Sequence, residues 1–276
     1  MSQSSSRTCV VLQPGYLPWL GFFAQMCRAD VFVYLDDVQF DKHGWRNRNR
    51  IKGPAGPQWL TVPVRLHGLH QPRINDVLID PTRPNWASKH LKTLRMNYGA
   101  CPFFDWLYQD LEQALTRKWT HLAELDIALV EVLSSKLNDG GQLYNDLPYE
   151  ARCGLEPAAG PLEKGSPPVL EGTFRRSSEM DLPTGRGARL IEICRQLRCD
   201  HYYAGAASRA YMDIAAFERA GIRVTFQDYQ HPTYPQRYGE FESHLSVVDL
   251  LFNCGPDSLE IITSLRPVEC AAESRD

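Results

Sequence analysis

Cations recur at alternate positions in one short segment of the chain, and no acidic residue interrupts them. If residues 46–52 form a strand, alternate side chains share a face at intervals of about 6.8 Å. Fixed guanidinium groups in such a row suit phosphates or carboxylates, with Asn47 on the opposite face. The alternative is an edge strand whose charges guard against aggregation. The cations are Lys42, Arg46, Arg48, Arg50 and Lys52.

A rigid aromatic loop, Gln-Pro-Gly-Tyr-Leu-Pro-Trp-Leu-Gly, follows the first apolar segment. Open α/β sheets bind ligands beyond the carboxyl ends of their strands, and the prolines and glycines fix the shape of this loop. We therefore expect Gln13, Tyr16 and Trp19 to form the wall of a pocket. The alternative is a plain strand-to-helix turn with an aromatic side chain in the core.

Two carboxylates, Asp36 and Asp37, end the second apolar segment, and Gln39 follows closely. Adjacent strand residues face opposite sides, so at most one of the two carboxylates points into a given cleft. We expect Asp37 to position an amine and Gln39 to contact substrate. The ordinary role of such residues, in a turn or a helix cap, is the alternative.

The last third of the chain offers two further candidate sites. A Gly-Ala-Ala loop precedes Ser208 and Arg209, which could hold a phosphate together with backbone N–H groups, although the loop has neither Walker spacing nor a GxGxxG motif. His231 lies in a proline-fixed loop with Tyr234 and Gln236. An imidazole titrates near neutrality, so His231 is the candidate general base, with plain hydrogen bonding as the alternative.

Strands and helices must position these residues, and the hydrophobic pattern predicts an α/β fold. We expect a mostly parallel open sheet with a helical middle segment and a β-hairpin insertion, formed by residues 45–52 and 58–65 around Gly-Pro-Ala-Gly-Pro. Prolines and glycines recur between 146 and 176, which predicts a surface loop. The predicted parallel strands cover 8–13, 31–35, 201–204 and 222–229, and the predicted helices 20–27, 85–98, 107–115, 122–137, 187–197, 214–220, 245–252 and 259–265.

Composition excludes several classes of protein. The chain has 276 residues, 43% of them hydrophobic, and a net charge of −3, so it is neither fibrous nor disordered, and no global field attracts nucleic acid or lipid. No apolar stretch would span a bilayer and no signal peptide is recognisable, so we expect a cytoplasmic protein. Eight cysteines without a CxxC pair predict free thiols and no metal site. We expect one domain over residues 8–265, with flexible termini at 1–7 and 266–276.

The segments together resemble the WbqC-like family of bacterial proteins. The matching stretches stand in family order from about residue 10 to residue 255, and their combination is specific. They are QPGYLPWLG, YLDDVQF, WRNRNRI, WLTVPV, NWASKHLKTLRMNY, YYAGAASRAYMD, YQHPTYPQ and LSVVDLLFNCG. The loop at 146–176 is longer or looser than the family pattern.

The resemblance implies a gene in a cluster for O-antigen sugars, other surface glycans or specialised metabolites. It favours an amine-bearing sugar nucleotide, or an acyl group delivered as a thioester. Our leading hypothesis is an amide-forming acyl or aminoacyl transferase without bound cofactor, whose donor is a coenzyme A or carrier-protein thioester. Its arginines would hold a phosphate-bearing substrate. The alternatives are nucleotidyl transfer and a non-catalytic scaffold of the same pathway.

Overall fold

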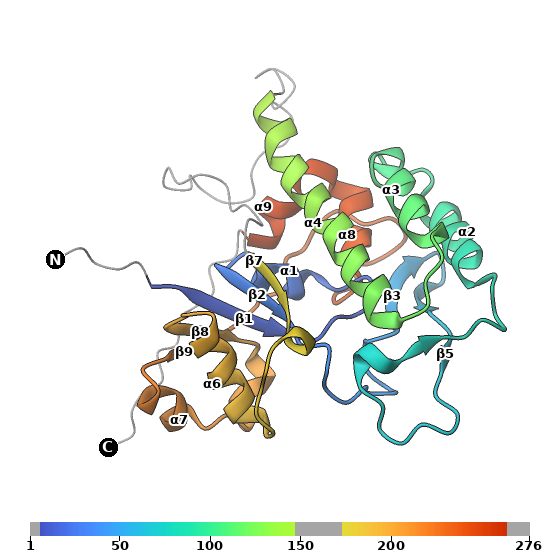
Figure 1. The fold of residues 1–276 in the computed structure, drawn as a ribbon. Coiled ribbons are helices and arrows are strands. Elements are labelled where there is room, and N and C mark those ends of the chain that lie inside the picture. Colours follow the sequence, from blue (N-terminus) through green and yellow to red (C-terminus); the bar gives the residue numbers. More distant parts are fainter. Residues whose placement is uncertain (1–5, 147–172, 264–276) are drawn as a thin grey trace.

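Five parallel strands form the centre of the molecule in the computed structural model, which describes residues 6–146 and 173–263 (Figure 1). They are β1 (Thr8–Leu12), β2 (Val31–Tyr34), β7 (Thr173–Arg176), β8 (His201–Ala204) and β9 (Arg223–Phe226). The order across the sheet is β7-β2-β1-β8-β9. The chain therefore adds β2 and then β7 on one side of β1. It later adds β8 and then β9 on the other side. This reversal between β1 and β8 is the topological switch point of a doubly wound sheet.

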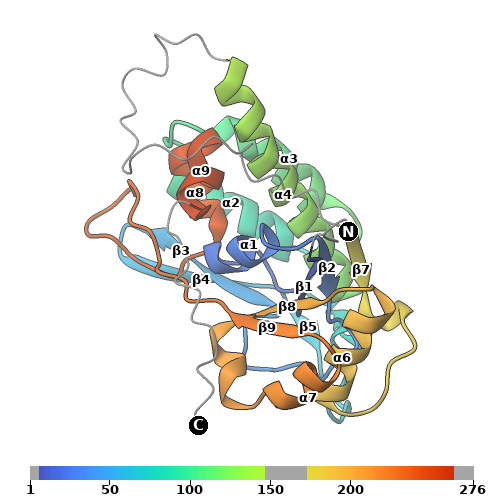
Figure 2. The same cartoon turned by 90° about the vertical axis from the view of Figure 1, so that its left-hand side faces the viewer.

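Alternation along the central strands gives the sheet two buried faces. Val10 and Phe32 belong to a large core on one face, and Val11 and Val33 to a smaller core on the other. Helix α1 (Leu20–Met26) covers the first face, and α6 (Arg186–Gln196) and α7 (Ile214–Arg219) cover the second. Figure 2 shows the sheet between these two layers.

A helical layer extends the larger core away from the sheet (Figures 1 and 2). Apolar residues at helical spacing give these helices their buried stripe. The layer consists of α2 (Trp86–Tyr98), α3 (Phe104–Thr116), α4 (Leu122–Asp146), α8 (Val247–Cys254) and α9 (Ser258–Thr263). Within the described residues, no helix combines the length and the apolar character that a bilayer span requires.

Two small antiparallel pairs stand beside the main sheet. Strands β3 (Arg48–Gly53) and β4 (Gly56–Thr61) form a hairpin in which Gly53 pairs with Gly56, and Gly56 adopts φ +103° at the turn. The second pair is β5 (Val64–Arg65) with β6 (Leu78–Ile79). The described part of the chain also contains four 3-10 turns: η1 (Ile74–Asp76), η2 (Ser177–Glu179), η3 (Ala206–Ala210) and η4 (Gly255–Asp257).

The α/β class, the parallel sheet and the hairpin are confirmed, and two details of the prediction are wrong. The predicted loop at 146–176 includes strand β7, which pairs with β2 at the sheet edge. The hairpin strand begins at Arg48, so Arg46 and Asn47 precede it instead of continuing its face. The remainder of that loop, 147–172, lies outside the described residues, as do 1–5 and 264–276. The single domain over 8–265 stays a prediction.

Candidate functional site

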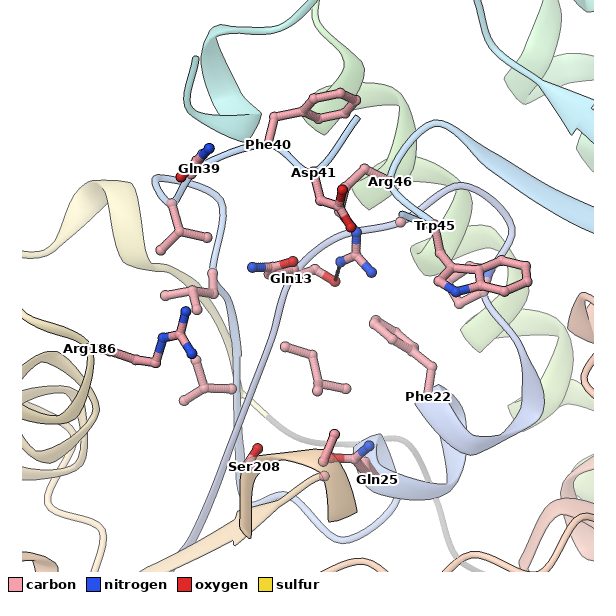
Figure 3. A pocket seen from close by; sticks show the side chains of 18 of the residues that line it. Gln13, Phe22, Gln25, Gln39, Phe40, Asp41, Trp45, Arg46, Arg186 and Ser208 are labelled. Atoms are coloured by element: carbon pink, nitrogen blue, oxygen red, sulfur yellow. Dashed lines mark hydrogen bonds between the residues drawn. The ribbon is translucent and has the colours of Figure 1, made fainter. Parts of the chain in front are cut away.

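A cavity of about 1450 Å³ opens at the carboxyl ends of β1, β2 and β8, where the strand order reverses. Its walls come from the loop after β1, the segment after β2, the start of α6 and turn η3. Figure 3 shows Gln13 in its middle, with Arg186 on one side and Arg46 and Trp45 on the other. Its polar and charged lining residues include Gln13, Gln25, Gln39, Asp41, Lys42, Arg46, Asn49, Arg186, Arg189, Ser208 and His244.

Arg46 holds the loop after β1 in place. Its Nη1 donates hydrogen bonds to the carbonyl oxygens of Gln13 at 3.0 Å and Pro14 at 3.1 Å, and its own carbonyl accepts from the Tyr16 amide at 3.0 Å. Burial lowers the pKa of the guanidinium, and the carboxyls of Asp126 and Asp41 counteract this in part. The predicted cation therefore lies at the cavity and also supports its wall.

Beneath Arg46, the side chain of Asp126 on α4 is fully buried. Neither of its carboxyl oxygens has a hydrogen-bond partner in the described structure. Burial raises the pKa of Asp126 well above its ordinary value, although the charge of Arg46 opposes the shift. The carboxyl is not among the residues that line the cavity.

Trp19 forms a second wall because its neighbour two positions on is Gly21. A Cβ atom at Gly21 would lie 2.3 Å from the indole, so only glycine lets the ring fold back over the start of α1. The indole stacks on His244, with ring centroids 5.3 Å apart, and on His231 at 6.4 Å. Trp19 and His244 line the cavity, whereas His231 lies against them outside the lining.

The His231 imidazole has a defined tautomer. Its Nδ1 lies 2.8 Å from the Pro232 carbonyl, which can only accept, so Nδ1 carries the proton. The other ring nitrogen, Nε2, is buried without a partner in the described structure. Burial lowers the pKa of His231, as does nearby His244, whose ring centroid lies 5.1 Å away. His231 is therefore a neutral imidazole with an unused acceptor nitrogen.

The two adjacent acids have separate roles. Asp36 is buried and accepts hydrogen bonds from the backbone amide of Ser178 at 3.0 Å and from its hydroxyl at 2.7 Å, which fixes turn η2 to β2. Asp37 forms an ion pair with Arg189 of α6 at 2.5 Å and accepts from Ser177 at 2.5 Å.

Burial alone would raise the pKa of Asp37, but the hydrogen bonds from Ser177 and Arg189 and the Arg189 charge outweigh it, so the pKa is lowered. Asp37 is ionised and reaches the cavity through Arg189, which lines it.

The start of α6 and turn η3 form the cationic side of the cavity near β8. The Arg186 guanidinium lies 4.6 Å from the Tyr211 ring centroid, and both residues line the cavity with Ser208. Arg209 lies over Phe226 at 4.9 Å and is not a lining residue. The sequence predicted Arg209 as the phosphate-binding arginine of this region, but the arginines that line the cavity are Arg186 and Arg189.

The remaining cations of the predicted row make different kinds of contact. Arg48 lies over the Trp59 ring at 4.5 Å and Arg50 over Trp45 at 5.7 Å. Lys52 is buried, and its Nζ donates to Gln236 Oε1 at 3.0 Å and to the carbonyl of Glu240. Only Arg46 and Lys42 of the row line the cavity.

Four other predicted substrate contacts are buried or tied elsewhere. The Tyr16 hydroxyl bonds to His90 Nδ1 at 2.8 Å, and the Asn47 amide donates to the Val62 carbonyl at 2.8 Å. The Tyr234 hydroxyl donates to Asp249 at 2.9 Å, and Gln236 accepts from Lys52. These four residues do not line the cavity, and their contacts stabilise the structure around it.

Of the predicted residues, the cavity therefore brings together Gln13, Trp19, Gln39, Arg46 and Ser208. The predictions missed Gln25, Asp41, Asn49, Arg186 and Arg189. A usable indication existed for the last two, since the Thr-Gly-Arg-Gly-Ala-Arg stretch places two arginines at the start of a predicted helix. Among the residues that the structure describes, no cluster of three His, Cys, Asp or Glu side chains could hold a metal ion.

Fold and cavity define a doubly wound α/β protein with a large, cation-lined cavity at its switch point. The chain belongs to the WbqC-like protein family, whose model matches residues 13–141 and 169–261. It is 33% identical over 265 residues to the uncharacterized protein Rv1507c of Mycobacterium tuberculosis (strain ATCC 25618 / H37Rv). That match covers 94% of this chain and 99% of the relative. No solved structure matches the chain significantly.

Proposed function

We propose that the protein binds a phosphate-bearing, nucleotide-like substrate in the cavity and transfers an acyl group to its amine. The observation that carries the proposal is the position of the cations at the switch point. Arg186 and Arg189 line the cavity from the start of α6, and Arg46 lies on the far side of Gln13 from Arg186 (Figure 3). Lys42 is a further cation of the lining. Doubly wound sheets bind nucleotides at this crevice, and guanidinium groups suit phosphate oxygens.

The size of the cavity supports a reaction between two substrates. Pockets for one small ligand typically enclose about 300–1,000 Å³, and this cavity measures about 1450 Å³. In our proposal the amine-bearing substrate lies toward Arg186 and Arg189. The acyl donor, a coenzyme A or carrier-protein thioester, enters from the side of Lys42 and Trp45.

The proposed chemistry requires an acceptor for one proton. The amine nitrogen attacks the thioester carbonyl carbon, a C–N bond forms, the C–S bond breaks, and the thiolate leaves. The His231–His244 pair takes the amine proton and returns a proton to the thiolate. His244 is the member that contacts substrate, with Trp19 stacked on both rings. Asp37 acts by orienting Arg189.

The proposal is tested by amide formation with purified protein. A coenzyme A thioester and an amino-sugar nucleotide are incubated together, and the amide and the free thiol are both quantified. His244→Asn should lower the turnover by about a hundredfold, within the range of general-base contributions. His70→Asn, a matched change at an exposed loop histidine, should not. Equal turnover in the two variants would remove His244 from the mechanism.

Nucleotidyl transfer is the second candidate, favoured by one observation. The β7-β2-β1-β8-β9 order places a crevice outside β1 and β8, where a mononucleotide fits. Against it, the loop after β1 carries Tyr16, Pro18 and Trp19 in place of the histidines that such enzymes use there. Pyrophosphate release from ATP with a sugar phosphate would move this candidate to first place.

A further inference from the structure

Two exposed tryptophans and two arginines form a patch on the β3–β4 hairpin and the segment that precedes it. We call it the Trp–Arg patch: Trp45, Arg48, Arg50 and Trp59. Trp45 is 43% exposed and Trp59 47% exposed, which is unusual for side chains of this size. Their ring centroids lie 5.1 Å apart. Each ring also carries a guanidinium, Arg48 on Trp59 and Arg50 on Trp45.

The patch is prearranged by the hairpin. Arg50 and Trp59 are direct cross-strand partners, and Arg48 donates to the carbonyl of His43 at 2.6 Å, so the side chains are held in place. Ordered side chains lose little conformational freedom when a partner binds. Tryptophan and arginine are also the residue types that contribute most to protein interfaces.

The charge of the patch is not neutralised. Within residues 6–146 and 173–263, Lys42, Arg48 and Arg50 make no ion pair. Lys42 is exposed and lies beside the patch in sequence. The surface therefore offers apolar rings together with unpaired positive charge, which is complementary to an acidic surface.

The patch is continuous with the mouth of the cavity. Trp45 belongs to the patch and also lines the cavity (Figure 3). Lys42, outside the patch, is a lining residue too. Arg186 lies on the opposite side of Gln13 from Trp45 (Figure 3), and Arg189 of the same helix also lines the cavity. A group that enters the cavity over the patch therefore faces the side near Arg186, where the proposed function places the amine-bearing substrate.

We propose that the Trp–Arg patch docks an acidic carrier protein, whose thioester-bearing arm enters the cavity past Trp45. The inference rests on the proposed acyl transfer and names its donor. A free anion would use the guanidinium groups and leave the indoles uncovered, and a neutral glycan would leave the charges unpaired. Nucleic acid is a poor match for a chain with net charge −3 and one short cationic patch.

The test uses Trp59, which belongs to the patch but does not line the cavity. The full-length protein is titrated with phosphopantetheine-bearing carrier proteins of the fatty-acid, peptidyl and D-alanyl types, and separately with coenzyme A. Trp59→Ala should raise the Kd for the carrier that binds by about tenfold or more, while the Kd for coenzyme A stays unchanged. Trp59→Phe should restore part of the carrier affinity. Higher salt should weaken carrier binding in the unmutated protein.

The matched control is Arg219→Glu on α7, which changes an exposed arginine of the smaller layer and should leave both affinities unchanged. If none of the carriers binds while coenzyme A does, the docking proposal is wrong and the proposed function stands. If a carrier binds through Trp59 but no phosphate-bearing ligand enters the cavity, docking holds and the proposed function fails. Equal carrier binding by Trp59→Ala and the unmutated protein, or binding of a neutral oligosaccharide that Trp59→Ala abolishes, overturns the docking proposal.

Discussion

At the scale of single residues, the side chains of Arg46 and Tyr16 hold the loop after β1 in place. Arg46 binds the carbonyl oxygens of Gln13 and Pro14, and the Tyr16 hydroxyl bonds to His90 on α2. The sequence indicated that this loop matters, because prolines and glycines fix it beside aromatic rings. It could not indicate that Tyr16 turns inward, since an imidazole 74 positions away provides its partner.

The alternating cations illustrate the same limit. A period of two predicts which side chains share a face, and Arg48 and Arg50 do lie on one face of the hairpin. It does not indicate which loops cover that face. Gln236 and Glu240 cover Lys52, so this cation of the predicted row ties the hairpin to the 229–244 segment instead of facing a ligand.

His90 should make the protein less stable in mild acid. Burial lowers its pKa from 6.5 to about 4, partly opposed by a hydrogen bond with the Thr61 backbone. Between pH 6.5 and pH 4 the imidazole of His90 is protonated in the unfolded chain but not in the folded protein. The stability present above pH 6.5 is therefore lost progressively as the pH falls toward 4. We expect this effect to lower the free energy of unfolding by about 3 kcal/mol.

Urea unfolding of the unmutated protein and of His90→Gln at a series of pH values from 7 to 4 measures this contribution. The glutamine variant should be less stable at pH 7 and should lose less stability on acidification. Both proteins keep the carboxylates with lowered pKa values, such as Asp37 and Glu124, so those groups cancel in the comparison. Parallel pH curves for the two proteins would contradict the assignment.

At the scale of elements, one buried network fixes the long segment between β9 and α8. Asp249 of α8 accepts hydrogen bonds from the Tyr98 hydroxyl at 2.7 Å and the Tyr234 hydroxyl at 2.9 Å. Tyr98 in turn accepts from the backbone amide of Lys52 at 2.9 Å. Helices α2 and α8, strand β3 and the segment that carries His231 therefore meet at one carboxyl group.

Tyr234→Phe should loosen that segment. The variant removes one of the two hydroxyl groups that solvate the buried Asp249 carboxyl, whose pKa burial already raises. We expect a loss of about 2 kcal/mol in the free energy of unfolding. Tyr238→Phe is the control, because it removes a single, partly buried hydrogen bond to the carbonyl of Asn97, and should cost about 1 kcal/mol or less. Equal losses in urea unfolding would contradict the role given to Asp249.

Most elements could be predicted from the sequence, and the exceptions have physical causes. Strands β1, β2, β8 and β9 and the hairpin are short apolar or alternating runs between turn residues. Strand β7 was not predicted because its sequence, Thr-Phe-Arg-Arg, is mostly polar and follows a stretch rich in proline and glycine. A polar sequence is compatible with its position at the edge of the sheet.

At the scale of the whole molecule, the order of the strands creates the site. Segments after β1, β2 and β8 and the start of α6 meet because the order of the parallel strands reverses between β1 and β8. Each of those segments could be found in the sequence, but their meeting depends on pairings that no local pattern reports. The sequence placed Arg186 and Arg189 at the start of a predicted helix, but only the order of the sheet shows that this helix, α6, lies beside the crevice.

The central claim is that this cavity binds a phosphate-bearing substrate, and a melting-temperature measurement tests it most directly. Amino-sugar nucleotides, coenzyme A and nucleoside diphosphates are added to three proteins: the unmutated chain, Arg186→Ala, and Arg209→Ala. The two arginines form a matched pair, since each lies over an aromatic ring and only Arg186 lines the cavity. A ligand that binds the folded state raises the melting temperature. We predict that at least one of these ligands stabilises the unmutated chain and Arg209→Ala, and that Arg186→Ala loses most of the shift. Equal responses from the two variants, or no shift with any of the ligands, would contradict the claim.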